Sequence, residues 1–599
     1  MSVRKVRRNQ LISPFGVGAV IDLAGESFVA EDAGKWRLWR GDLSFPRLAG
    51  YLKVKNLRMP PPGTQIPYYR FPQWLFCPNP RCRRMVRWST TVELGDTAPV
   101  CESCDEKRRL VPMRFVVVCG NGHLGDIDWR TWAHSRPRNP NQRGCQVRGE
   151  QLRFLSMAGV GSGLQSLEVR CEACQASRTL EDLMRPGALN QRCQGRQPWQ
   201  YDEDRQACTE RPAVQQRGAS SVYFPLVTSA IDIPPQSNWS ERNDPRAILI
   251  ENGDFQRLLE KPDHGAREAL LSEITADTGI SRTVVVSALT SLRAEAGETA
   301  EGGTLKDIRP DEWMALTAPP AGHDPRDNFI TRAAQFPAPD SHGRLSGAAS
   351  LLAAVVDKVV LVDRLREVRV LRGFERHTTK EEVPANLSST PAFLPAVEVF
   401  GEGYFLQFDE SAIAAWEARD DVQKRSELLS TRMGQLKRNW LEPPTPRYVL
   451  LHTLAHLLLR FTAFEAGYPT SALRERLYAS EEGSSLRMAG ILIYTAAGDT
   501  EGTLGGLARM GEPERLIRLL SAAVAGAQWC SFDPVCRESS AQGPHGLSLA
   551  ACHACALVPE TSCEAGNRLL DRALVVDEQL GFLSGLADEL GRIPGGGAW

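Results

Sequence analysis

The sequence predicts an α+β protein of several domains, with N-terminal zinc-ribbon modules, a central mixed and largely helical region, and a C-terminal Cys-rich zinc-binding α/β domain. The chain of 599 residues is too long for one hydrophobic core. Its 15 cysteines are clustered, and strand-like and helix-like stretches both occur. Hydrophobic residues make up 42% and charged residues 24%, which excludes a largely disordered chain. The expected domains are a β-rich segment at 1–70, a zinc-ribbon region with a basic surface at 71–235, the middle region at 236–440 and the zinc-binding domain at 441–599.

Charge is distributed unevenly along the chain. The net charge is only −1, but residues 1–150 contain 25 Lys and Arg against 13 Asp and Glu. Residues 151–250 contain 11 of each kind, so residues 251–599 carry a net charge of −13. The basic N-terminal part is therefore where we expect a polyanion to bind, and the acidic remainder is expected to face protein or solvent.

The sequence predicts a cytoplasmic protein with no membrane contact. The best apolar stretch, 351–362, is interrupted by Asp357 and Lys358, so it is not a spanning helix. The charged segment MSVRKVRRNQ is not followed by the apolar core and cleavage site of a signal peptide. In a reducing cytoplasm, clustered cysteines are more often zinc ligands than disulfides.

The N-terminal segment 10–29 predicts a glycine-rich turn followed by a strand. Its GVGAV run resembles a phosphate loop only superficially, because no Lys follows it. The pattern G-x-x-x-x-G-K-[ST] occurs nowhere in the chain. The sequence therefore gives no sign of a nucleotide-hydrolysis site.

The first cysteine group has the spacing of a zinc ribbon. Cys77-x4-Cys82 and Cys101-x2-Cys104 lie in turn-rich knuckles, with the alternating segment 86–94 between them. Two knuckles joined by a hairpin can present four thiolates to one zinc ion. Such a site is closed, so we expect a structural ion rather than a catalytic one.

A second, looser group consists of Cys171-x2-Cys174 followed by Cys193 and Cys208. It has one tight knuckle and a more open second half. We expect these four cysteines to form a second ribbon.

Between the two ribbons, Cys119-x3-His123 with His134 and Cys145 downstream could form a further zinc site. The alternative is a turn-rich segment whose histidines make local hydrogen bonds. The same region has five arginines interleaved with Trp129 and Trp132, which suits phosphate contact and base stacking, although a solvated basic face is an equal alternative. The candidate DNA-binding residues are Arg130, Arg136, Arg138, Arg143 and Arg148.

The middle of the chain mixes strands and helices. Residues 213–235 are apolar and β-rich, and residues 253–297 have helical periodicity. Residues 347–375 predict a further helical stretch that turns to strand at 368–371. Residues 391–408 predict two short strands around a Gly-Glu-Gly turn.

The last domain opens with the nearly apolar segment YVLLHTLAHLLLRF, which predicts a buried helix. His452 and His456 lie one helical turn apart, the spacing of a zincin, but Thr453 stands where the catalytic Glu should be. Two histidines satisfied inside a packed helix is therefore the favoured interpretation. A metal-dependent hydrolase that uses them with a carboxylate such as Asp499 is the competing one.

The third cysteine group has five thiols for four ligand positions: Cys530-x5-Cys536 and Cys552-x2-Cys555-x7-Cys563. The CHAC knuckle with Cys563 is the core of the predicted site, and Cys536 is preferred over Cys530 as the fourth ligand. A structural zinc can supply on the order of 10 kcal/mol of folding free energy. The loop-rich segment 530–566 needs such a contribution, because it has few apolar residues.

Several stretches, together with the ribbon cysteines, carry a family resemblance: RRNQLISPFGVGAVIDLAGESF, CGNGHLGDIDW, QRGASSVYFP, the predicted helix RLREVRVLRGF, and a tail with WCSFDPVC and ACHACALVPETSCEAGNRLLDR. They resemble the DrmB family, components of the DISARM anti-phage defence system, essentially from end to end. The tail resembles the zinc-binding domain that also closes MrfA-like DNA-repair helicases.

The resemblance implies a partner and a set of zinc ligands. DrmB proteins work with DrmA, a superfamily-2 helicase, and the pair is expected to engage phage DNA at strand ends or single-stranded regions. No catalytic residue carries over. The residues expected to bind Zn²⁺ are Cys77, Cys82, Cys101, Cys104, Cys171, Cys174, Cys193, Cys208, Cys530, Cys536, Cys552, Cys555 and Cys563.

The leading hypothesis is therefore a non-enzymatic, zinc-stabilised DNA-binding partner of a helicase. The alternatives are the metal-dependent hydrolase or nuclease and a protein scaffold that holds defence proteins together without touching DNA.

Overall fold

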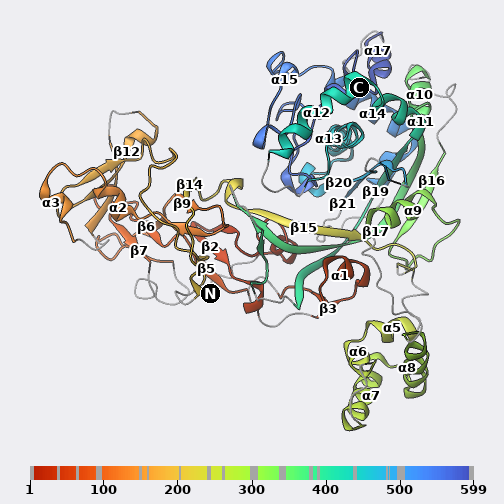
Figure 1. Ribbon diagram of the computed structural model, residues 1–599, viewed down its shortest axis with the longest axis horizontal. Coiled ribbons are helices and arrows are strands. Elements are labelled where there is room, and N and C mark those ends of the chain that lie inside the picture. The colour runs from red at the N-terminus through yellow and green to blue at the C-terminus, as the bar shows by residue number, and fades with distance from the viewer. Residues whose placement is uncertain are drawn as a thin grey trace. The chain divides into compact units, whose positions relative to one another are not determined.

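The computed structural model describes most of the chain (Figure 1). The described residues are 6–36, 41–61, 66–88, 98–146, 151–157, 161–200, 204–235, 237–238, 245–259, 264–296, 308–335, 346–376, 382–387, 392–435, 441–480, 483–484, 486–495 and 506–592. The chain folds into two units, each assembled from separated stretches. The first unit comprises Met1–Leu43, Val54–Thr228 and Arg369–Val397, and the second comprises Ser44–Lys53, Ser229–Val368 and Glu398–Trp599.

The first unit is built from small antiparallel sheets. Four described sheets have three strands each: β1 (Val20–Leu23), β2 (Glu26–Ala30) and β5 (Tyr68–Arg70); β7 (Met85–Arg87), β6 (Trp74–Phe76) and β8 (Val111–Pro112); β10 (Leu124–Asp126), β9 (Phe115–Val118) and β14 (Ala213–Gln216); and β11 (Leu152–Ser156), β12 (Leu167–Cys171) and β13 (Ser177–Thr179). Its remaining elements include α2 (Trp129–His134), α3 (Pro140–Arg143), β3 (Asp42–Leu43), β4 (Asn56–Arg58) and β18 (Val383–Pro384).

The short sheets of the first unit are held by local hydrophobic clusters and by turns rather than by one large core. Helix α2 begins where the side chain of Asp128 accepts a hydrogen bond from the Thr131 N–H. Its Trp129 and Trp132 are buried together with Val169 of β12. This packing places the C-terminal end of α2 against the β12–β13 hairpin.

The second unit combines a larger sheet with helices. Its elements are α1 (Pro46–Leu52), α5 (Pro245–Glu251), α6 (Gly253–Leu259), α7 (His264–Thr278), α8 (Arg282–Ala296), α9 (Ile308–Thr317), β16 (Ile330–Ala334), α10 (Ser346–Ala353), α11 (Glu410–Glu417), α12 (Asp420–Gly434), α13 (Pro446–Ala466), β20 (Leu473–Ala479), β21 (Ala489–Thr495), α14 (Pro513–Ala527), α15 (Val535–Glu538), α16 (Ala573–Val576) and α17 (Ser584–Arg592). Three long strands contribute residues to both units: β15 (Phe224–Ile231), β17 (Val356–Glu375) and β19 (Phe393–Phe408). The helical periodicity of 253–297 is confirmed by α6, α7 and α8.

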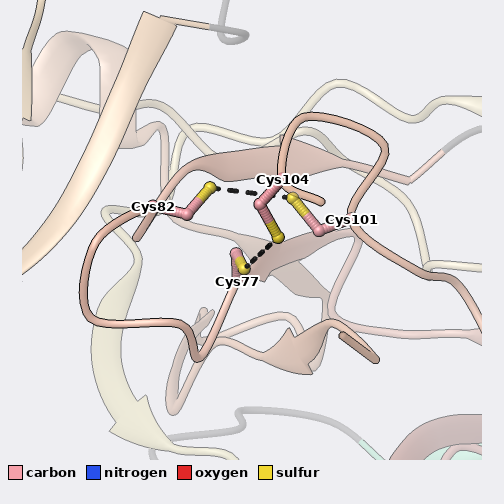
Figure 2. A group of neighbouring side chains, drawn as sticks. All are labelled: Cys77, Cys82, Cys101 and Cys104. Carbon is pink, nitrogen blue, oxygen red and sulfur yellow. Dashed lines mark hydrogen bonds between the residues drawn. The ribbon is translucent and has the colours of Figure 1, made fainter. Parts of the chain in front are cut away.

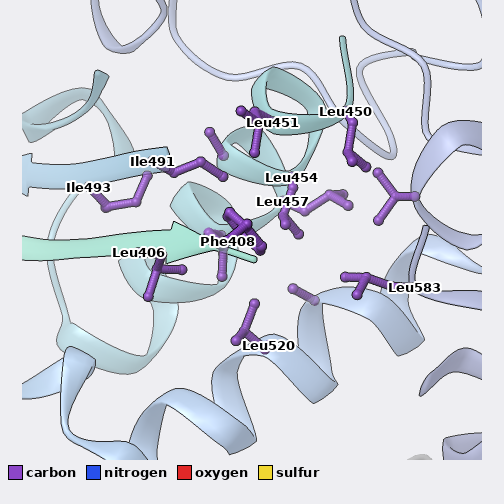
Figure 3. Packing of buried hydrophobic residues seen from close by; sticks show 14 of the residues in the cluster. Leu406, Phe408, Leu450, Leu451, Leu454, Leu457, Ile491, Ile493, Leu520 and Leu583 are labelled. Carbon is purple, nitrogen blue, oxygen red and sulfur yellow. The ribbon is translucent and has the colours of Figure 1, made fainter. Parts of the chain in front are cut away.

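The buried helix predicted in the last domain is α13, which is the centre of the second unit's core (Figure 3). It begins at Pro446, capped by the Thr445 side chain, and ends before Gly467, whose φ of 72° is left-handed. It packs against β20 and β21 and against α12, α14 and α16. Although α13 is long and apolar enough to cross a membrane, 72% of its most apolar window is buried inside the protein, as in the core helix of a globular fold.

Two predictions for the long strands are wrong in part. The helix predicted from residue 347 is confirmed only by α10, and the strand predicted at 368–371 lies within β17. Residues 356–375, including RLREVRVLRGF, form this 20-residue strand rather than a helix. The arginines of this stretch reach neighbouring acidic residues: the Arg366 guanidinium lies 2.9 Å from Asp232 and 2.8 Å from Glu398. Six of the 20 residues are valine, and the buried side chains of β17 belong to different hydrophobic clusters, so sheet pairing overrides the helical pattern.

The Gly-Glu-Gly segment of residues 391–408 is not a turn, because β19 runs through it without interruption. Tyr404 pairs with Ile493 and Gly403 with Tyr494 of β21. A Cβ at Gly403 would lie 2.2 Å from the carbonyl oxygen of Ile493. The glycine is therefore required for close approach of the neighbouring strand rather than for a reversal of the chain.

Candidate metal centres

All fifteen cysteines belong to five groups of possible metal ligands, and the ligand atoms within each group lie within 4.8 Å of one another. Hydrogen-bonded sulfur atoms in these groups are separated by 3.4 to 4.0 Å. A disulfide requires about 2.05 Å, so this is the geometry of thiols. Thiolates about 2.3 Å from one tetrahedral zinc ion would be about 3.8 Å apart, so the sulfur spacing fits zinc.

The first group is the predicted ribbon of Cys77, Cys82, Cys101 and Cys104. Cys77 and Cys82 come from the loop between β6 and β7, and the sulfur atoms of the two knuckles face one another (Figure 2). The Sγ atoms of Cys77 and Cys104 are 3.8 Å apart, and those of Cys82 and Cys101 are 3.7 Å apart. The four thiols thus surround one position, as the spacing predicts.

The knuckles of this ribbon are held by backbone hydrogen bonds. The Cys82 N–H donates to the carbonyl of Asn79 at 3.0 Å, and the Cys77 N–H donates to that of Arg84 at 2.9 Å. Arg83 adopts a left-handed φ of 51° to close its turn. Burial raises the pKa of the Cys77 thiol to about 12 and also raises the pKa of Cys101. These thiols would therefore ionise only when a cation stabilises the thiolates, and metal binding would release protons.

The predicted second ribbon is not what the structure shows, because its four cysteines lie in two different groups. Cys193 and Cys208 join Cys119 and His123 from the turn between β9 and β10. The Cys119 Sγ lies 3.5 Å from that of Cys193 and 3.9 Å from that of Cys208, and 3.4 Å from His123 Nδ1. A hydrogen bond from the Cys193 thiol lowers the pKa of Cys119 to about 4.

Cys171 and Cys174 instead join His134 and Cys145. His134 Nε2 lies 3.2 Å from the Cys174 Sγ, and the sulfur atoms of Cys145 and Cys171 are 4.0 Å apart. The other ring nitrogen of His134 is 2.8 Å from the carbonyl oxygen of Arg130, the usual arrangement of a metal-ligating histidine. The proposed set of Cys119, His123, His134 and Cys145 is therefore also divided between two groups. The packing of α2 on the β12–β13 hairpin brings His134 to the knuckle of Cys171 and Cys174. This packing cannot be predicted from the spacing of the residues in the sequence.

The C-terminal group also differs from its prediction. Cys530, Cys536, Cys552 and Cys555 lie together, with Sγ–Sγ distances of 3.4 Å between Cys530 and Cys552 and 3.8 Å between Cys536 and Cys555. Cys530 is thus a full member, and its N–H donates to the Asp533 carboxylate at 2.8 Å. Cys563 does not belong to this group. It lies with His452, His456 and Glu475.

The histidine pair on α13 is not placed for hydrolysis. His452, His456 and Glu475 have no solvent exposure, so water and a substrate could not reach them. Asp499, the carboxylate suggested for the hydrolase, lies outside the described residues. Glu475 could not be found from the sequence, because no motif links a strand residue to the HxxxH spacing of the preceding helix.

The predicted nucleic-acid surface is only partly as expected. Trp129 and Trp132 are buried, with exposed fractions of 0% and 2%, so they are not available for base stacking. Arg136 is exposed but paired with Asp182. Arg138 and Arg143 are exposed and have no carboxylate partner among the described residues, whereas Arg130 is half-buried on α2. Arg148 lies outside the described residues.

Comparison with known proteins gives matches at both ends of the chain. A family described as the MrfA Zn-binding domain matches residues 454–556, which include the four cysteines of the C-terminal group. A domain of unknown function (DUF8724) matches residues 7–224. The DISARM protein DrmB of Bacillus paralicheniformis is 31% identical over 584 residues, covering 93% of this chain and 97% of that protein.

Proposed function

This chain belongs to the DrmB family of DISARM components, and from that premise we propose that it is a non-catalytic, zinc-stabilised partner of a DrmA-type superfamily-2 helicase that helps the pair to engage phage DNA. The observation that carries the proposal is the completeness of the cysteine groups. Each offers four protein ligands around one position. A zinc ion held in that way has no open coordination site for water or substrate, so the zinc is structural. Because the chain also lacks the G-x-x-x-x-G-K-[ST] pattern, we assign the motor activity to the partner.

The excess of positive charge in residues 1–150, with 25 basic against 13 acidic residues, supports a DNA-facing role for this part of the chain. Exposed arginines without a carboxylate partner are the best candidates for phosphate contacts, because no internal ion pair has to be broken before they bind. Within the part of the chain that the structure describes, Arg138 and Arg143 meet this requirement.

The two arginines are held in place by the metal group beside them. Arg138 precedes α3 and Arg143 ends it, and the Asn139 side chain caps the helix by accepting from the Gln142 N–H at 3.0 Å. The Gln142 side chain in turn donates to the carbonyl oxygen of Cys174 at 3.3 Å. A zinc ion bound by His134, Cys145, Cys171 and Cys174 would therefore fix the position of the DNA-facing segment.

The test is a titration of a labelled single strand at several salt concentrations, with the chain alone and in complex with its helicase. Each phosphate contact contributes roughly −0.7 to the slope of log affinity against log salt. Replacing Arg138 and Arg143 together by alanine should therefore reduce the magnitude of the slope by about 1.4.

Arg136→Ala is the matched control, because that guanidinium already donates to Asp182, a carboxylate that it shares with Arg178. We expect this variant to retain nearly the wild-type slope. An affinity that is independent of salt, or a double variant that binds like the wild type, would reject these arginines as phosphate contacts. If this chain adds nothing to DNA binding by the helicase, a scaffold role is supported instead.

A further inference from the structure

A fifth cluster of ligand atoms lies inside the last domain, and it shares no residue with the four Cys-rich groups. His452 and His456 project from one face of α13 toward Glu475 of β20, and Cys563 approaches from the segment after Ser562. The two imidazole rings meet edge to face with centroids 4.6 Å apart. His452, His456 and Glu475 are not exposed to solvent, and Cys563 is 7% exposed.

The hydrogen bonds around this cluster leave lone pairs directed inward. His456 Nδ1 lies 2.8 Å from the carbonyl oxygen of Ala556. Because a carbonyl only accepts, the ring proton is on Nδ1 and a neutral His456 presents the lone pair of Nε2 to the cluster. That Nε2 is 3.5 Å from Glu475 Oε1 and has no hydrogen-bond partner among the described residues.

The sulfur atom is also surrounded by donors. Cys563 Sγ accepts the N–H groups of Ala565 at 3.3 Å and Asn567 at 3.2 Å. His452 Nε2 lies 3.2 Å from this sulfur and 3.1 Å from Glu475 Oε1. Backbone donors that point at a buried sulfur are what a thiolate requires.

A divalent cation at the centre would balance the charge of these side chains. A buried carboxylate and a buried thiolate are costly unless they are paired. The cations that the structure describes against Glu475 are the two imidazoles, which are charged only when protonated. One divalent ion held by two neutral imidazoles, one carboxylate and one thiolate would have a net charge of zero.

We propose that His452, His456, Glu475 and Cys563 form an additional, closed zinc centre with mixed nitrogen, oxygen and sulfur ligands. Zinc accepts all three donor types in tetrahedral sites. With ordinary zinc–ligand bond lengths, nitrogen and oxygen ligands would be about 3.3 Å apart and nitrogen and sulfur ligands about 3.6 Å apart. The observed separations of 3.1, 3.5 and 3.2 Å are close to these values.

The centre would join three separate parts of the domain: the middle of α13, strand β20 and the segment that contains Cys563. The family match to the MrfA Zn-binding domain ends at residue 556 and begins at 454, so two of the four ligands, His452 and Cys563, lie outside it. The ion would stabilise the hydrophobic core of α13 directly, whereas the Cys530 group stabilises the loop-rich segment.

The test is the number of zinc ions per full-length chain, measured by elemental analysis after gel filtration. The wild type should contain five zinc ions, and Glu475→Gln and Cys563→Ser should each lose one. Glu402→Gln is the matched control. Glu402 is equally buried, and its carboxylate accepts the Leu507 N–H at 3.0 Å and the Tyr468 hydroxyl at 3.2 Å, outside any metal group. This variant should retain the wild-type count.

X-ray diffraction of the wild-type chain at the zinc absorption edge gives a readout that does not depend on variants folding. An anomalous peak among the four side chains supports the proposal, and its absence overturns it. A wild type with four ions, or unchanged counts in both ligand variants, would also overturn it. Neither result bears on the DNA titration, so this centre and the proposed function fail or succeed separately.

Discussion

Serine substitutions at Cys171 and Cys193 discriminate between one shared metal site and two separate ones. If both cysteines belonged to a single ribbon, the double variant would lose one zinc ion, the same as each single variant. In the structure the sulfur of Cys193 lies 3.5 Å from that of Cys119, and the sulfur of Cys171 lies 4.0 Å from that of Cys145. We therefore expect each single variant to lose one zinc ion and the double variant to lose two.

The structural consequences should also be separate. A structural zinc contributes on the order of 10 kcal/mol of binding free energy, which is comparable to the whole stability of a domain, about 5–15 kcal/mol. Losing one ion should therefore unfold the segments that it joins. Cys193→Ser should raise hydrogen exchange in 119–123 and 204–208, and Cys171→Ser should raise it in 134–145 and 171–177.

Elemental analysis and hydrogen-exchange mass spectrometry of the full-length chain are the assays. Glu181→Gln, an exposed substitution near the Cys171 knuckle, is the control that should change neither measurement. A double variant that lost only one ion would refute the division into two centres. So would the same exchange pattern in both single variants.

Three further predictions concern the second unit. Arg476→Met removes the nearest cation, at 2.6 Å, from the fully buried Glu312 and leaves only Arg47 at 3.7 Å among the ion pairs that the structure describes for it, so chemical denaturation should show a loss of about 3–5 kcal/mol. Adding Glu312→Gln should recover part of it, and an additive loss would contradict the pairing. Leu454→Ala should lower the free energy of unfolding by about 2–5 kcal/mol because it opens a cavity in the hydrophobic cluster around α13, whereas the exposed Leu428→Ala should change it by less than about 0.5 kcal/mol. Cys552→Ser should unfold the C-terminal zinc segment and abolish co-purification with the helicase, and a variant that retained both its metal and its partner would argue against a structural zinc there.

Secondary structure could be predicted from the sequence where the hydrophobic pattern of a single segment was sufficient. The helix around His452 is apolar on every side, and such a segment is stable only inside a core. The strands β17 and β19 were not predictable in the same way. Regularly spaced arginines such as Arg366 suit an amphipathic helix as well as a strand whose neighbours carry Asp232 and Glu398. A glycine such as Gly403 can mark a turn or a close approach between strands.

The pairing of cysteines into knuckles, such as Cys101 with Cys104 and Cys552 with Cys555, could be predicted from spacing alone, because two or four intervening residues allow a tight turn to direct both thiols to one side. Which knuckles share a position could not be predicted, because that depends on how a helix end such as His134, or a strand residue such as Glu475, packs against a loop distant in the sequence. Spacing along the chain constrains neighbouring residues through the backbone, whereas ligands far apart in sequence are brought together by packing, which leaves no periodic signal.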